Sequence, residues 1–170
     1  MRIELNKASK IIIKLGSSII DHRDDMIING ICTNITEFLK ENKEVMLVTS
    51  GAISQGMKVM DVKNKPKDIK KLQSLAAVGQ QKLMLMYEKI FSEHDFQTAQ
   101  VLITHNDIND RVRYLNIKGT LEELLNNGVI PIINENDVVS TEEIKFGDND
   151  NLASVSYTHL RCRRTTECRS

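Results

Sequence analysis

The feature that most constrains this fold is a repeated alternation of short apolar runs with segments of helical periodicity. Each of four runs is five to seven residues long and rich in Ile, Val or Leu, as buried strands are. These runs are Lys10–Leu15, Glu44–Thr49, Thr98–Thr104 and Val129–Ile133. Helical spacing of apolar residues marks Asp24–Asn42, a short segment ending near Met60, Leu72–His94 and Arg113–Asn126. Repeated strand–helix units predict an α/β fold with a mainly parallel sheet sandwiched by helices.

The residues after each strand are candidates for a site, because open parallel sheets bind ligands at the carboxyl ends of their strands. Small or polar residues stand at all four positions: Gly16-Ser17-Ser18, Ser50-Gly51-Ala52, Thr104–Asp107 and Asn134–Asp137. We therefore expect one polar-ligand site at this edge of the sheet.

Lys14 ends the first strand, directly before a Gly turn and two hydroxyl residues. A Lys in this place can contact a phosphate, and a Gly turn lets backbone N–H groups approach an anion. The alternative is a surface Lys before a tight turn, and the motif by itself favours this alternative. The chain has neither a G-x-x-x-x-G-K-[ST] loop nor a G-x-G-x-x-G fingerprint.

Two further motifs suit a charged ligand. Ser50, Gly51 and Ala52 open a helix, whose N-terminus favours a carboxylate or phosphate, although simple capping by Ser50 accounts for them as well. Amides and carboxylates cluster at Asn134–Asp137 and again at Gly147–Asp150. They suit recognition of an ammonium group or of a magnesium–nucleotide complex, and the alternative is that they only form turns.

Composition excludes several classes of protein. The 170 residues suit one domain with a real core, and 41% hydrophobic and 27% charged residues are typical of a soluble protein. No apolar run has the length of a membrane span and no signal-peptide pattern begins the chain, so we expect a cytoplasmic protein. No catalytic Ser/His/Asp set, metal-spaced His cluster or activated Cys stands out, which suits phosphoryl transfer.

The composition changes abruptly near Val155. Residues 155–170 hold four Arg and one Glu, whereas residues 1–154 hold 19 Lys and Arg against 22 Asp and Glu. A mildly acidic body argues against nucleic acid as a partner. A disordered basic tail or a small basic binding patch would account for residues 155–170. We prefer a third interpretation, a non-native, disordered tail, because VSYTHL resembles the translation of a sequencing-library adapter.

The motifs KLGSS, VTSGAISQG, LAAVGQQKLM, LNIKGTLEELL and PIINENDVVSTEEIKFGDNDNLA, in this order, resemble the glutamate 5-kinases of the amino-acid kinase family. The resemblance runs from Lys10 to Ser154. It implies an enzyme that uses ATP and Mg²⁺ to phosphorylate the side-chain carboxylate of L-glutamate, the first step of proline biosynthesis. It also implies feedback inhibition by L-proline and a homo-oligomer at full length. It implies no metal ion held by protein side chains.

The resemblance also implies residue roles. Lys14 would contact the transferring phosphate, with Gly16 and Ser17 lining the phosphate region. Asp148 and Asp150 would organise catalytic lysines. The residues implied at the glutamate site are Ser50, Gly51, Ala52, Asn134, Asp137 and Asn149.

The chain departs from the family in its length. After GDNDNL the family continues with a nucleotide-binding half, so residues 1–154 are expected to be the N-terminal, glutamate-binding part of the kinase domain. The alternatives are a non-catalytic fragment that retains only the glutamate- or proline-binding half, or another amino-acid kinase with a different acceptor.

Overall fold

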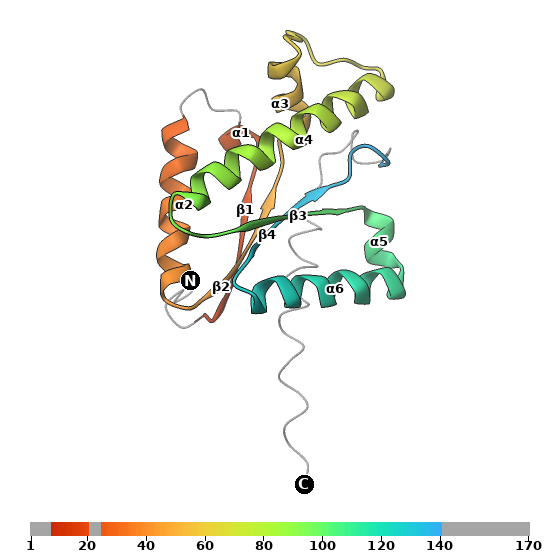
Figure 1. Ribbon diagram of the computed structural model, residues 1–170. Helices are drawn as coiled ribbons and strands as arrows, with labels where there is room; N and C mark the ends of the chain where they lie inside the picture. The colour runs from red at the N-terminus through yellow and green to blue at the C-terminus, as the bar shows by residue number, and fades with distance from the viewer. Residues whose placement is uncertain (1–7, 21–24, 141–170) are drawn as a thin grey trace, which may run out of the picture.

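The fold is built on a four-stranded, fully parallel sheet. The computed structural model describes residues 8–20 and 25–140. The strands are β1 (Lys10–Leu15), β2 (Glu44–Thr49), β3 (Thr98–Ile103) and β4 (Ile130–Glu135). They pair in the order β1-β2-β4-β3, as Figure 1 shows. The prediction of an α/β fold with a parallel sheet is therefore confirmed.

Six helices are present in the described part of the chain: α1 (Ser17–Ile20), α2 (Asp25–Lys40), α3 (Ala52–Val59), α4 (Ile69–Ser92), α5 (His105–Asn109) and α6 (Arg111–Asn126). Apolar residues of α2 and α4 pack on one face of the sheet, and those of α6 pack on the other. Figure 1 shows α4 crossing the sheet and α3 standing with the first turns of α4 beyond the strand ends. None of the helices between residues 8 and 140 that are described is long and apolar enough to cross a membrane.

Strand β4 shows why the sheet has two cores. Alternate side chains of a strand point to opposite faces, so Ile130 and Ile132 join the core with α2 and α4, while Ile133 joins the core with α6. Every residue of β4 is buried. A central parallel strand covered on both faces reads as a continuous apolar run, which is how the sequence presents it.

The strand register brings the carboxyl ends together. Leu15 pairs with Thr49 across β1 and β2, Val48 pairs with Ile133 across β2 and β4, and Ile103 pairs with Glu135 across β3 and β4. The segments that follow the four strands therefore start at one edge of the sheet.

Several boundaries differ from the predictions. Helices α1 and α5 were not expected, and α4 begins at Ile69 because the Asp68 carboxylate accepts the backbone N–H of Lys71 at 2.9 Å. Strand β4 continues to Glu135 because β3 supplies pairing partners that far. The sequence also predicts a hairpin over Val138–Gly147, most of which lies outside the described residues, while residues 137–139 form a turn.

Candidate functional site at the carboxyl edge of the sheet

The segments after β1 and β2 are held against each other. Gly51 adopts φ 99°, a left-handed conformation that favours glycine, and a Cβ there would lie 3.0 Å from Ile20 Cγ2. Gln55 Nε2 on α3 donates to the backbone carbonyl of Ile20 at 3.2 Å. The Gly16 turn and the Ser50–Ala52 segment are thus parts of one surface.

Helices α3 and α4 meet at two glycines. A Cβ on Gly79 would lie 1.8 Å from the Ala52 carbonyl oxygen, and one on Gly56 would lie 1.9 Å from the Leu75 carbonyl oxygen. No side chain larger than hydrogen fits between these backbones. The first turn of α3, which follows Gly51, is therefore fixed by direct backbone packing on α4.

A buried amide pair connects α4 to β4. Asn134 Nδ2 donates to Gln80 Oε1 at 2.8 Å, across 54 residues of sequence. Asn134 is 2% exposed and Gln80 is 8% exposed. About two turns further along α4, the Tyr87 and Thr49 hydroxyls share a buried hydrogen bond of 2.7 Å. Burial raises the pKa of the Tyr87 hydroxyl, so this pair is neutral.

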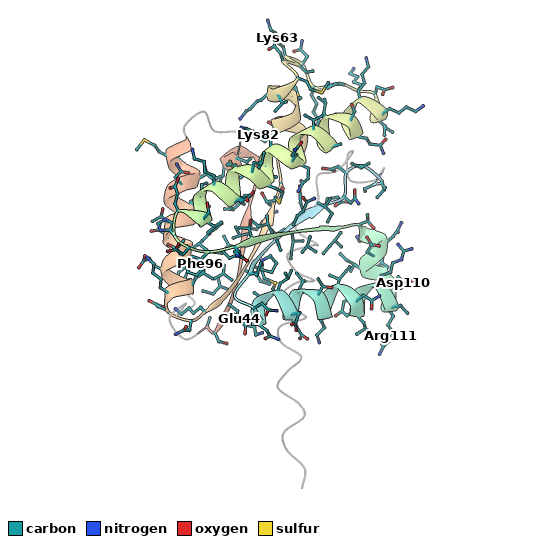
Figure 2. All side chains as sticks on the ribbon, in the orientation of Figure 1. Glu44, Lys63, Lys82, Phe96, Asp110 and Arg111 are labelled. Carbon is teal, nitrogen blue, oxygen red and sulfur yellow. The ribbon has the colours of Figure 1, made fainter. Side chains whose placement is uncertain are left out.

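The carboxylate of Asp137 at this edge has a raised pKa. Burial raises its pKa to about 6, and the positive charge of Lys65 acts in the opposite direction. Lys65 belongs to the segment between α3 and α4, so this segment lies near the end of β4. Figure 2 shows Lys63, two residues earlier, at the outer tip of the same segment.

The end of β3 forms a polar pocket. Thr104 and Asp107 make a capping box at the start of α5, and the Asp107 carboxylate also pairs with Arg113 at 2.9 Å. Hydrogen bonds from Thr104 and the charge of Arg113 lower the pKa of Asp107. The pocket has a volume of about 420 Å³. Its lining consists of Thr104, His105, Asn106, Asp107, Arg113, Asn136, Val139 and Ser140.

Some of the predicted site residues are described by the structure, and the others lie outside the described residues. Those after β1, β2 and β4 lie at one edge, and Lys14 and Ser17 are exposed there. The suggestion that Ser50 caps α3 is wrong, because the N-cap residue is Gly51 and no side chain caps this helix. Asp148, Asn149 and Asp150 lie outside the described residues.

Sequence reasoning did not single out Gln80 or Glu135. Glu135 is 4% exposed, and neither carboxylate oxygen has a hydrogen-bond partner within residues 8–20 and 25–140. A buried carboxylate without a partner is costly, so Glu135 is a further candidate for the site. The only signal in the sequence was its place among the polar residues at a strand end. Across the same described residues, no three His, Cys, Asp or Glu side chains gather as metal ligands.

The fold and this edge define a class of protein. Residues 9–156 match the model of the Amino acid kinase family, and the chain belongs to that family.

Within the family, the similar relatives are glutamate 5-kinases. The chain is 46% identical over 159 residues to the Glutamate 5-kinase of Burkholderia ambifaria, and 47% and 45% identical to those of Paraburkholderia phymatum and Azoarcus sp.. Each alignment covers 91% of this chain and 43% of the relative. The chain thus spans less than half the length of the curated relatives that it matches.

Solved structures of related kinases resemble the fold more distantly. An aspartate kinase from Synechocystis aligns with a TM-score of 0.46 at 13% identity, over 72% of this chain and 21% of that protein. A Giardia carbamate kinase aligns with a TM-score of 0.49 at 12% identity, over 75% of this chain and 60% of that protein.

Proposed function

We propose that this chain is the acceptor-binding part of a cytoplasmic glutamate 5-kinase, which transfers the γ-phosphoryl group of ATP to the side-chain carboxylate of L-glutamate. The product, L-glutamyl 5-phosphate, begins proline biosynthesis. The observation that carries the proposal is the convergence of four polar strand ends at one edge, in a chain 45–47% identical to glutamate 5-kinases.

The acceptor side uses residues from β2 and β4. Asp137 would bind the α-ammonium group of glutamate, because a partly buried carboxylate beside the site attracts a cation more strongly than one in water does. Asn134, held by Gln80, lies on the same strand segment. The N-terminus of α3 offers backbone N–H donors for a carboxylate, since no side chain caps it. Asn149 completes the proposed glutamate site.

The phosphate side uses the end of β1. Glutamate brings an ionised carboxylate as its own nucleophile, so the protein needs no strong general base. The harder task is to bring two anions together. Lys14 would neutralise charge on the transferring phosphate, while the Gly16 and Ser17 segment lines the phosphate region. Asp148 and Asp150 would organise catalytic lysines.

The nucleotide side belongs to a part of the protein beyond this chain. Magnesium would arrive bound to the ATP phosphates, as it does in many kinases. We further propose that L-proline inhibits at the glutamate site and that the full-length enzyme is a homo-oligomer. In this proposal, residues 1–154 are the N-terminal part of the kinase domain and residues 155–170 are a non-native tail.

Acceptor choice tests the function directly. Full-length protein is supplied with MgATP and with glutamate, aspartate or N-acetylglutamate, and ADP release is measured. We expect turnover with glutamate and no turnover with aspartate or N-acetylglutamate. Preference for another of these acceptors would replace the proposed substrate, and ATP turnover independent of every acceptor would remove the function.

The chain length gives a second test. The pure 170-residue chain is expected to show no ATP-dependent phosphorylation of glutamate, because it lacks the nucleotide side. Robust turnover by this chain would refute that expectation. Resequencing the native locus across the Ser154 codon tests the tail, and a natural reading frame encoding residues 155–170 would contradict the adapter origin.

A further inference from the structure

Helix α4 fixes three parts of the site at once. Gly79 admits the backbone of α3 at Ala52, and the next residue, Gln80, accepts the hydrogen bond from Asn134. Tyr87 bonds Thr49 at the end of β2. Since β2, α3 and β4 all meet this helix, α4 sets the relative positions of groups that approach the ligand from different strands.

The amide of Asn134 has two ends, and Gln80 determines how they are used. The Nδ2 group is committed to Gln80 Oε1 at 2.8 Å, which leaves Oδ1 as the acceptor end of the same amide. Without Gln80 Oε1, a buried N–H would lose its partner, and no described contact would fix which end of the amide faces the ligand. A turned amide would present a donor where an ammonium ligand needs an acceptor.

Gln80 itself carries an unmatched group. Its Nε2 is buried and has no hydrogen-bond partner within the described part of the chain. A buried donor without a partner costs about 1–3 kcal/mol, so stability alone favours an apolar residue of similar shape at this position. Its neighbours Gln81 and Lys82 are exposed on the outer side of α4, where Figure 2 shows Lys82.

We propose that Gln80 is a positioning residue of the acceptor site, which acts through Asn134 to keep an amide oxygen directed at the ammonium group of the amino-acid substrate. This inference rests on the proposed function. It assigns Gln80 an effect on acceptor affinity, with little effect on ATP affinity or on the chemical step.

The experiment compares Gln80→Met with Gln81→Met in the full-length kinase. Both changes replace the same residue type on the same helix, but Gln81 is exposed. We expect Gln80→Met to raise KM for glutamate about tenfold, with kcat and KM for ATP within about threefold of wild type, because one hydrogen-bonded contact is lost. Gln81→Met should change none of these constants.

A double-mutant cycle tests the route through Asn134. In an Asn134→Ala background, Gln80→Met should change KM for glutamate less than twofold, because the side chain through which Gln80 is proposed to act has been removed. Gln80→Glu keeps an acceptor oxygen for Asn134 Nδ2 and should hold KM within about threefold of wild type. If Gln80→Met does not fold, Gln80→Leu, which also lacks the acceptor oxygen, takes its place and should raise KM for glutamate by the same factor.

Three results would overturn the inference: a normal KM in Gln80→Met, additive effects with Asn134→Ala, or a rise above about tenfold in Gln80→Glu. In each case wild-type turnover of glutamate would leave the proposed function intact. Failure of the wild-type protein to phosphorylate glutamate would instead remove the proposed function, and the inference with it.

Discussion

Gly79→Ala tests the backbone-to-backbone packing of α3 on α4. The added Cβ would lie 1.8 Å from the Ala52 carbonyl oxygen and 2.3 Å from the Gly56 nitrogen. Ordinary contact begins at 3.4 Å, so α3 and α4 would have to separate by about 1.6 Å. Both obstructing atoms belong to the backbone, so no side chain can rotate away.

The cost follows from two opposing effects. Overpacking of this kind costs about 3 kcal/mol, because the backbone of α3 must move as a unit. Alanine returns about 1 kcal/mol relative to glycine inside a helix. The net loss of about 2 kcal/mol should lower the melting temperature by about 4–8 °C in a chain of this size.

The assay is thermal unfolding of the 170-residue chain, followed by circular dichroism at 222 nm. The matched control is Gly119→Ala on α6, where an added Cβ meets nothing within 4 Å. That variant should gain about 0.5–1 kcal/mol. If Gly79→Ala were stabilised as much as Gly119→Ala, the two helices could not be packed backbone to backbone, and the account of how α4 fixes α3 would be refuted.

The remaining predictions concern the site and its support. In the full-length protein, Lys14→Ala should lower kcat by about 10²–10³-fold with an unchanged melting temperature, since the residue is exposed. A loss of kcat that comes with a lower melting temperature would favour a structural role for Lys14. Burial raises the pKa of Asp137 to about 6, and in the proposed function its ionised form would bind the ammonium group, so KM for glutamate should rise about tenfold per pH unit below pH 6; this rise should vanish in Asp137→Asn. Tyr87→Phe should destabilise by about 1 kcal/mol in urea unfolding, because Thr49 loses a buried 2.7 Å hydrogen bond; no loss would mean that the bond contributes nothing.

The strands were predictable because their signal is local. Lys10–Leu15 and Glu44–Thr49 form as expected, since short runs rich in Ile, Val or Leu favour strands. Helix α5 was missed because its five residues have no apolar periodicity, and a capping box between Thr104 and Asp107 defines it instead. The start of α4 was missed because its signal is a single cap, Asp68.

The edge at which the site lies was predictable from the order of strands and helices. Small and polar residues after parallel strands had to meet there, and Gly51 is a glycine because its φ of 99° favours one. The role of Ser50 as a cap was misjudged, since capping depends on where the helix begins. Gln80 falls on the buried face of α4, four residues after Ala76 and three before Leu83, but that spacing does not identify Asn134 as its partner.

By itself the sequence determined the α/β class, the parallel sheet and the edge that carries the polar residues, because hydrophobic periodicity and turn chemistry act between near neighbours in the chain. Only the tertiary structure decided which distant residues meet. Gln80 reaches Asn134, Gly79 admits Ala52, and Lys65 comes near Asp137, in each case because a helix packs on a sheet or on another helix at one register. Such contacts depend on the packing of whole elements, and no local pattern encodes them.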